Sequence, residues 1–521
     1  MTSIETEIVI VGGGPVGIGL AIDLAQRGHE ITVVEKYQHL QQVPKGQNLT
    51  PRTMEHLTAW GASGFARALR PTSRKTGNGG LNCWKNLLSG HHYSWLNREN
   101  VQQFYYQTVE RLPQYLTEQA LRTRAEQLES IHLMTDCEAT GCSQKTKNVH
   151  TQFLNRSTGE KIVIESDFLV GCDGSRSVIR DAAMIKQTNN DHDKKMALIV
   201  FRSQELDELL SSLPFSAFYN ALDPKLQGYW KFIGRVNDQG DWFFHAPVAN
   251  DCSKDDFDFT AYLHETVGQP FSLTISYVGF WDLRFAVAER YRTDRILIAG
   301  DAAHSHPPYG GYGINTGFED ARNLGWKLSY RQKGLAPDEL LDTYDEERRL
   351  VFQSTADHFI EHLIHQDRKF LNTWDDRDLE PEFETAWGQR TTDNLTVMQY
   401  EPHYSGSSIV DGEDGGSISA VGDHQIEARA GHHLAPPPDY DEFQSYLSKD
   451  FTVICAENTD LSEIMHESKQ LEIPIQAITM TSKQMASWNR SWILLRPDHF
   501  VASSGNDSEV PVGQLKKAII P

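Results

Sequence analysis

A glycine-rich stretch near the start of the chain has the residue types and spacing of a phosphate-binding turn. It comprises Gly12, Gly14, Pro15, Val16 and Gly17. Gly12 would permit a tight bend, Gly14 would let the backbone approach a pyrophosphate, and Gly17 would let a helix and a strand pack closely. Glu35 follows at the position where a carboxylate accepts hydrogen bonds from ribose hydroxyls and repels a 2′-phosphate. The spacing predicts a site for FAD or NAD and disfavours NADP.

Such a turn binds phosphate only when a strand precedes it and a helix follows it. Residues 8–11 are all β-branched, which is typical of a strand buried on both faces. From residue 15 to 27 apolar side chains recur at every fourth position, which predicts a helix, and residues 31–34 form a second β-branched run. These elements make a βαβ unit with the glycine turn at its first junction.

Two later stretches carry a family resemblance. Residues 167–180 read DFLVGCDGSRSVIR, and residues 295–328 read RILIAGDAAHSHPPYGGYGINTGFEDARNLGWKL. Together with the glycine turn they resemble the flavoprotein aromatic hydroxylases of the para-hydroxybenzoate and phenol hydroxylase type, in the order and spacing of that family. The resemblance runs to about residue 350. It continues more weakly to SWILLRPDHFVA (491–502), which is similar to the last strands of the thioredoxin-like domain of larger members.

The resemblance implies that the nucleotide site holds FAD and that NADH or NADPH acts as a transient co-substrate. It also assigns cofactor contacts to residues outside the glycine turn. Arg52 matches an arginine near the FAD phosphates, Gln114 matches a glutamine near the ribityl chain, and Asp173 lies in a motif linked to both FAD and the nicotinamide donor. We interpret Asp173 mainly as a hydrogen-bonding corner of the fold.

The segment after residue 295 can be interpreted physically. A buried strand ends at Asp301, whose carboxylate could hold ribityl hydroxyls. The loop that follows, with Pro308 and Gly311, leaves a bare surface for a flat ring. A helix that begins at Gly313, Ile314 and Asn315 would aim free amides and its positive dipole end at the anionic reduced flavin.

The resemblance further implies a monooxygenase. It would use NAD(P)H and O2 to hydroxylate a phenolic or hydroxylated heteroaromatic substrate through a flavin C4a-hydroperoxide. Aromatic strands between 187 and 280 would line the substrate site. Catalytic candidates are Pro308 in the loop and Tyr229 and His245 as proton-relaying groups. Two alternatives stay open: an FAD epoxidase or Baeyer–Villiger-type oxygenase acting on a polyketide-like substrate, and an FAD dehydrogenase that is not an oxygenase.

Other patterns argue against other chemistry. Cys137 and Cys142 have the spacing of a redox disulfide, but they follow the glycine turn too late in the chain for a flavin disulfide reductase. His358, His362 and His365 share one helix face without a metal-binding motif, so no metal site is predicted. The segment from about 401 onward contains one cysteine, Cys455, which excludes dithiol chemistry within it.

Composition sets the remaining expectations. The 521 residues carry a net charge of −22, which repels nucleic acid and anionic lipid, and no apolar run approaches a membrane span. We expect a cytoplasmic protein whose partners are a small aromatic substrate and O2, and which could form a homodimer.

We predict an α/β fold with a Rossmann-like FAD-binding domain, a mixed β-sheet substrate domain and a C-terminal thioredoxin-like domain. The predicted boundaries are 1–186 with 280–350 for the FAD-binding domain, 187–279 for the substrate domain, 351–400 for a helical connection and 401–521 for the C-terminal domain.

Overall fold

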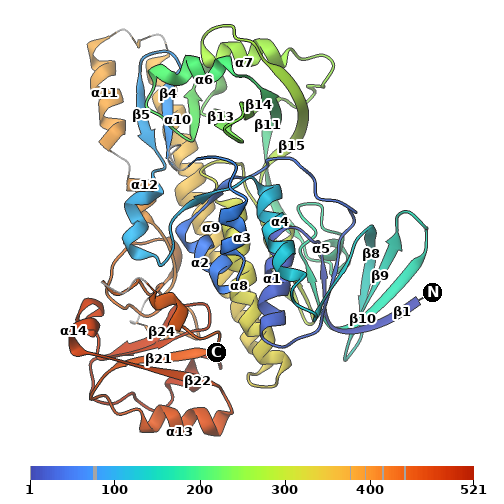
Figure 1. The fold of residues 1–521 in the computed structure, drawn as a ribbon, viewed down its shortest axis with the longest axis vertical. Helices are drawn as coiled ribbons and strands as arrows, with labels where there is room; N and C mark the ends of the chain where they lie inside the picture. Colours follow the sequence, from blue (N-terminus) through green and yellow to red (C-terminus); the bar gives the residue numbers. More distant parts are fainter. Residues whose placement is uncertain are drawn as a thin grey trace.

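The structure is a computed structural model. It describes residues 2–73, 79–375, 377–378, 380–392, 395–412, 416–438 and 442–521. Three parts are stacked along the long axis in Figure 1: a sheet that contains β11, β14 and β15 at the top, a helix-covered mixed sheet that contains β1 and β10 in the middle, and a small C-terminal domain at the bottom. The predicted α/β class and its domain types are confirmed.

The middle part is built on a sheet with strand order β16-β17-β10-β1-β2-β7, to which β9 and β8 are added. Its strands are β1 (Thr2–Val11), β2 (Ile31–Val34), β7 (Ile131–Met134), β8 (Cys137–Gln144), β9 (Val149–Asn155), β10 (Lys161–Gly171), β16 (Arg292–Thr293) and β17 (Ile296–Ile298). Strands from three separate parts of the chain pair in parallel, β10 with β1, β1 with β2, and β10 with β17. Residues 8–11 are almost completely buried, as their β-branched run predicts.

Helices pack against this sheet. They are α1 (Pro15–Gln26), α2 (Pro51–Ala59), α3 (Ser63–Ala68), α4 (Gln114–Ala125), α5 (Val178–Ala182), α8 (Gly313–Gln332) and α9 (Asp342–Thr355). The long helix α8 packs against α1, α2 and α9 in the centre of the molecule (Figure 1). A short pair, β3 (Asn48–Leu49) with β6 (Glu110–Arg111), joins the segment before α2 to the segment before α4.

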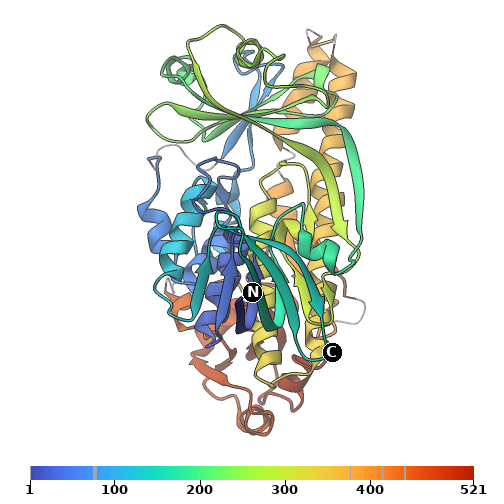
Figure 2. The ribbon, with the colours of Figure 1, turned by 90° about the vertical axis from the view of Figure 1, so that its right-hand side faces the viewer.

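The second sheet lies across the end of the first domain, as Figure 2 shows from the side. Its order is β18-β15-β11-β14-β13-β12-β4-β5. Its strands are β4 (Gly80–Trp84), β5 (His92–Trp95), β11 (Gln187–Arg202), β12 (Phe218–Leu222), β13 (Lys231–Arg235), β14 (Asp241–Ala249), β15 (Thr274–Ala288) and β18 (His304–Ser305), and its helices are α6 (Glu205–Leu209) and α7 (Phe259–Val267).

The predicted interval 187–279 contains only part of this sheet. Strands β4 and β5 belong to it although they lie within the predicted range 1–186, because β4 pairs in parallel with β12. At the other edge β15 continues to Ala288 and pairs with β18. The substrate sheet is therefore assembled from three segments of the chain.

A helical connection leads to the C-terminal domain. It contains a π-helical turn (Ala356–Glu361), α10 (His362–Trp374), α11 (Pro381–Thr392) and α12 (Leu395–Gln399). The domain itself contains β19 (Tyr400–Tyr404), β20 (Ile418–Val421), β21 (Phe451–Ala456), α13 (Ser462–Leu471), β22 (Ile475–Met480), α14 (Ser482–Met485), β23 (Trp492–Leu495), β24 (Val501–Gly505) and α15 (Gln514–Lys517). The order β22-β21-β23-β24, with β21 and β22 parallel and the other pairs antiparallel, is thioredoxin-like.

Buried ion pairs hold the C-terminal domain against the first domain. Arg496 lies 2.6 Å from Glu347 of α9, and Lys327 of α8 lies 2.7 Å from the same carboxylate. Although burial alone would raise the pKa of Glu347, Arg496 and Lys327 hold it well below its usual range. Removing one partner of such a group leaves a buried unpaired charge, at a cost of about 3–5 kcal/mol. No described helix has both the length and the apolar character needed to cross a membrane.

Candidate active site

The glycine turn lies between β1 and α1 and requires glycine at two positions. Gly12 has φ +107°, and a Cβ there would lie 2.2 Å from the carbonyl oxygen of Cys172. A Cβ on Gly17 would lie 2.0 Å from the carbonyl oxygen of Gly12, so this glycine permits close packing of helix on strand. At Gly14, the N-cap of α1, a Cβ would have no described atom within 4 Å. The space above Gly14 fits a pyrophosphate at the helix N-terminus.

Glu35 is held at this turn by backbone amides. Its carboxylate accepts hydrogen bonds from the amide of Gly13, at 2.7 Å, and from the amide of Tyr37, at 2.9 Å. The side chain is 9% exposed, and that exposed part belongs to the wall of a large cavity. This fixed position suits an acceptor for ribose hydroxyls.

One continuous cavity of about 870 Å³ starts at the glycine turn and ends at the second sheet. Most of the predicted site residues line it: Gly12, Gly14, Pro15, Val16, Glu35, Gln114, Asp173, His245, Asp301, Pro308, Gly311, Gly313 and Ile314. These residues come from segments up to about 300 positions apart, so the fold brings the sequence motifs together.

Asp173 and Asp301 lie along the middle of this cavity. Asp173 accepts hydrogen bonds from the Ser177 hydroxyl, at 2.5 Å, and from the amide of Ile179, at 3.2 Å, so it caps the start of α5 as a corner of the fold. Asp301 follows β17 in a short 3₁₀ turn, and its carboxyl group opens into the cavity. Enclosure by protein raises the pKa of Asp301, while His304 and Lys45 oppose that rise.

The loop after Asp301 forms the platform expected for a flat ring. Gly310 and Gly311 have φ +70° and +69°, which favours glycine at both positions. Helix α8 begins at Gly313, as predicted, and its first amides have no partner within the helix. A Cβ on Gly313 would lie 3.8 Å from the ring of His306, which is ordinary van der Waals contact. The backbone at Gly313 is therefore uncovered, and a small side chain would fit there.

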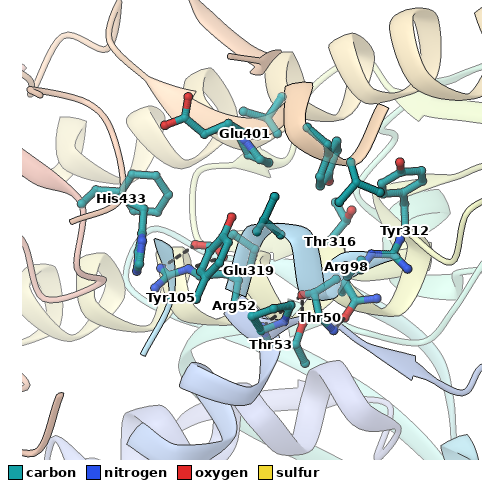
Figure 3. A pocket seen from close by; sticks show the side chains of 18 of the residues that line it. Thr50, Arg52, Thr53, Arg98, Tyr105, Tyr312, Thr316, Glu319, Glu401 and His433 are labelled. Atoms are coloured by element: carbon teal, nitrogen blue, oxygen red, sulfur yellow. Dashed lines mark hydrogen bonds and ion pairs between the residues drawn. The ribbon is translucent and has the colours of Figure 1, made fainter. Parts of the chain in front are cut away.

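Four predicted residues do not line the large cavity: Gly17, whose packing against the turn is described above, and Arg52, Asn315 and Tyr229. Arg52 pairs with Glu319 at 3.1 Å, as Figure 3 shows. It also donates to the carbonyl of Asp498 at 2.6 Å. Asn315 bonds to the backbone of Asn48 and Gly311, at 2.9 and 2.7 Å, so it holds the loop in place from behind. Tyr229 is 3% exposed and belongs to the buried aromatic cluster that also contains Trp95 and Phe218, but it does not reach the cavity wall. The contact of Arg52 with FAD phosphates is therefore corrected: this side chain joins α2 to α8 and to the C-terminal domain.

Two cations that the sequence analysis missed lie in the cavity wall instead. Lys45 precedes Arg52 by seven residues, and Arg122 of α4 donates to the carbonyl of Gly13 at 3.1 Å. Both positive charges are near the place of the pyrophosphate. The signal for Arg122 was available, since it follows Gln114 by eight residues, about two turns of the same helix.

The far end of the cavity is an aromatic chamber. Its wall includes Trp95, Phe218, Phe232, Phe243, His245, Tyr277, Phe280 and Trp281. The ring of His245 lies 5.0 Å from that of Trp281 and 5.1 Å from that of Phe243, centre to centre. Burial lowers the pKa of His245 to about 3, so its imidazole is neutral at pH 7. Its Nε2 atom is buried with no hydrogen-bond partner among the described residues.

A second neutral histidine, His306, lies beside the ring platform and was also missed. Its Nδ1 is 2.7 Å from the carbonyl oxygen of Pro307, and its Nε2 has no described partner. Burial lowers the pKa of His306 to about 4. Its place in the HSHPP stretch directly before Pro307 was the available signal.

The two cysteines with the spacing of a redox pair lie on one strand, and Cys137 lines the large cavity. Cys137 and Cys142 are free thiols on β8, and burial raises the pKa of Cys142 to about 11. Within the described chain no three His, Cys, Asp or Glu side chains gather as metal ligands would.

The donor set fits FAD. The carboxylate of Glu35, which is held in place, suits the ribose hydroxyls of the dinucleotide. The open space at Gly14 and the two cations suit its pyrophosphate, and the helix N-terminus beside the bare loop suits its ring.

Comparison with known proteins also supports an FAD site. Residues 5–358 match the FAD binding domain family. Over 555 aligned residues, covering 99% of this chain and 97% of the relative, the chain is 28% identical to a 4-methyl-5-nitrocatechol 5-monooxygenase from Burkholderia sp. It is 31% identical to a putative polyketide hydroxylase from Streptomyces coelicolor over 67% of this chain and 56% of the relative. It is 33% identical to an uncharacterized aromatic compound monooxygenase from Bacillus subtilis over 66% of this chain and 65% of the relative.

Solved structures share the fold over nearly the whole chain. The flavin-dependent monooxygenase PieE, in complex with FAD and substrate, superposes with a TM-score of 0.83 at 20% identity and covers 98% of this chain. The rebeccamycin biosynthetic enzyme RebC, in its substrate-free form, gives 0.79 at 24% identity and covers 99%. With the matched family and the cavity described above, these likenesses lead to one conclusion: the chain belongs to the FAD binding domain family and is an FAD-dependent flavoprotein monooxygenase of the aromatic hydroxylase type.

Proposed function

We propose that this enzyme uses NADH or NADPH and O2 to hydroxylate a small phenolic or hydroxylated heteroaromatic ring. The balanced reaction is Ar–H + NAD(P)H + H⁺ + O2 → Ar–OH + NAD(P)⁺ + H2O. The observation that carries this proposal is the continuity of the cavity, which joins the nucleotide turn to an aromatic chamber at the bare loop 307–313.

FAD, when bound, supplies the redox chemistry that links the nicotinamide donor to O2. The protein holds it by Glu35, Asp301 and the amides at the start of α8. The aromatic walls exclude water from the end of the cavity where the substrate ring would lie, and a dry site limits wasteful side reactions. Pro308 and Gly311 would present a flat surface between the flavin ring and the substrate ring.

His245 orients the substrate in this proposal. A neutral imidazole has one nitrogen that accepts a hydrogen bond, and a phenolic hydroxyl is a donor that would satisfy the buried Nε2. Its low pKa makes His245 a hydrogen-bond acceptor more than a base. The earlier expectation for Tyr229 as a proton relay is not retained, because this side chain lies outside the cavity wall.

A small substrate is favoured over a polyketide. One relative that aligns over 99% of this chain and 97% of its own length is named for a nitrocatechol, whereas a putative polyketide hydroxylase aligns over only 56% of its own length. Oxygenation of a larger polyketide-like ring system, by hydroxylation, epoxidation or a Baeyer–Villiger-type step, is the second candidate, since several relatives carry polyketide-related names.

The test is a substrate screen. Purified enzyme is mixed with NADH or NADPH and with phenols, catechols, nitrocatechols, hydroxypyridines and polycyclic phenols, while NAD(P)H oxidation and product mass are followed. We expect at least one single-ring compound to stimulate oxidation and to gain one oxygen atom. Stimulation by polycyclic compounds alone would favour the second candidate.

A further inference from the structure

A second cavity of about 70 Å³ lies where the first domain meets the C-terminal domain (Figure 3). We call it the junction cavity. It lies between α2, α8, α9 and a 3₁₀ helix (Arg98–Phe104) on one side, and β19 with His433 and Phe500 on the other. Its apolar wall includes Val101, Val351 and Val397.

Three arginines and the carboxylates of Glu319 and Glu401 line the junction cavity, and two of the arginines are neutralised. Glu401 is paired outside the cavity with Arg429, at 2.7 Å, and with His432, at 2.8 Å. Arg52 pairs with Glu319 at 3.1 Å, and Arg348 pairs with Asp320 at 2.8 Å. Glu319 is also bonded to His56 at 2.8 Å, so it is not available to the third arginine.

Arg98 is the third arginine, and it has no carboxylate partner among the described residues. It is 6% exposed. Its Nη2 atom donates to the carbonyl of Gly310, and its guanidinium lies 5.6 Å from the centre of the Tyr312 ring. No hydrogen bond to a described residue occupies Nε or Nη1, although the side chain lines the cavity. A buried charge without a partner is costly, because its lost hydration is not replaced.

We propose that the junction cavity binds a small organic monoanion, with its carboxylate on Arg98 and a short apolar body against Val101, Val351 and Val397. A charge-assisted bond would supply the missing counter-charge. A cavity needs roughly 10–15 Å³ of this volume for each water. About 70 Å³ therefore accommodates a ligand of about four to seven heavy atoms, such as a short-chain carboxylate.

This site shares wall residues with the flavin cavity. Tyr312 lines both cavities, and the carbonyl of Gly310 that Arg98 holds belongs to the bare loop beside the ring. An anion on Arg98 would draw the guanidinium toward itself and change its hold on that loop. The bound anion is therefore expected to alter the surroundings of the flavin ring without entering the substrate chamber.

The test uses the FAD-loaded full chain and isothermal titration calorimetry with butyrate, with uncharged butanamide as its matched ligand. We expect butyrate to bind one per chain and butanamide to bind roughly tenfold more weakly or worse. Arg98→Gln should weaken butyrate by a similar factor. Val101→Phe should abolish binding by filling the cavity while it leaves the charge of Arg98 in place. Arg202→Gln, the same change on an exposed side chain of the second sheet, should have no effect.

Absence of butyrate binding to the unaltered protein would overturn the proposal, as would equal affinity for butyrate and butanamide. If Arg98→Gln fails to fold, Val101→Phe decides: retained binding in that variant would place the site elsewhere. A shift of the visible FAD spectrum on adding butyrate would support communication with the flavin, and binding without a shift would contradict it. None of these measurements depends on a substrate, so they stand apart from the proposed hydroxylation.

Discussion

At its nucleotide end the large cavity begins at a tight backbone turn of the first βαβ unit, whereas its aromatic end is bounded by side chains from several strands. The glycine turn and Glu35 lie within the first βαβ unit. The aromatic chamber takes side chains from β5, β12, β13, β14 and β15. The nucleotide end should therefore be sensitive to added atoms and backbone strain, and the aromatic end to the chemistry of individual side chains.

The largest expected effect is that of Gly12→Ala. Its Cβ would lie 2.2 Å from the carbonyl oxygen of Cys172, at a positive φ. Strain and overpacking together should cost about 2–5 kcal/mol and should be seen as a large loss of FAD affinity and a lower Tm. Gly28→Ala is the matched control, because it also has a positive φ but no described atom within 4 Å of the added Cβ. It should keep FAD affinity, and equal loss in both variants would argue against a special role for the turn.

The next effect should be that of His245→Phe at the aromatic end. The replacement keeps a buried ring but removes the acceptor at Nε2. Substrate-stimulated NAD(P)H oxidation should fall roughly ten- to a hundredfold because the ring hydroxyl is no longer oriented. FAD content, measured from the visible spectrum, should stay at the unaltered level. Full turnover in this variant would contradict the assignment of His245 to the substrate site.

The same variant has a signature in pH. The pKa of His245 is about 3 in the folded chain, below its ordinary value of 6.5, so the unfolded chain binds the additional proton between these values. Relative to His245→Phe, the unaltered protein should lose unfolding free energy as pH falls from about 6.5 toward 3. Denaturant unfolding at pH 7 and pH 5 checks this, and a pH-independent difference would contradict neutral burial.

Asp301→Ala should have an intermediate effect at the middle of the cavity. Loss of a charged hydrogen bond to the ribityl chain should weaken FAD binding by about 1–3 kcal/mol. Asp255→Ala makes the same charge change on an exposed turn and should bind FAD normally. Fluorescence titration of the two apoproteins with FAD compares their affinities. Equal affinities would contradict a contact between Asp301 and the cofactor.

Gly313→Val should separate cofactor binding from oxygen use. The added methyl groups would extend from a Cβ 3.8 Å from His306, beside the ring platform and remote from the adenosine end. With FAD saturating, the ratio of hydroxylated product to NAD(P)H consumed should fall roughly two- to tenfold as H2O2 increases. An unchanged ratio would show that this loop is not beside the reacting ring.

The smallest effect is expected for Cys455→Ser in the C-terminal domain. This thiol is 1% exposed on β21, and Thr479 Oγ1 lies 4.0 Å from its sulfur. The threonine hydroxyl is therefore a polar neighbour for the serine hydroxyl. Turnover should be unchanged, with a stability loss of about 1 kcal/mol. Loss of turnover in a folded variant would indicate thiol chemistry in this domain.

The same contrast explains what the sequence could predict. Strand 31–34, strand 296–298 and the start of α8 at Gly313 follow from local patterns, and the structure has them at those residues. The pairing of β4 with β12 joins residues more than 130 positions apart and has no local mark. Arg52 was assigned to FAD because it matches an arginine near the FAD phosphates in the resembling family. Its side chain instead pairs with Glu319, 267 residues further on, while Lys45 lines the cavity. Side-chain direction at such positions depends on partners that only the tertiary fold supplies.

The central claim is that both ends of the cavity act together to place one oxygen atom on an aromatic ring. It is tested most directly with ¹⁸O2, NAD(P)H and the best compound from the substrate screen, followed by mass spectrometry of the product. We predict a product with one ¹⁸O atom, formed by the unaltered enzyme and lost together with FAD in Gly12→Ala. A product without ¹⁸O, or NAD(P)H oxidation that no aromatic compound stimulates, would contradict the account.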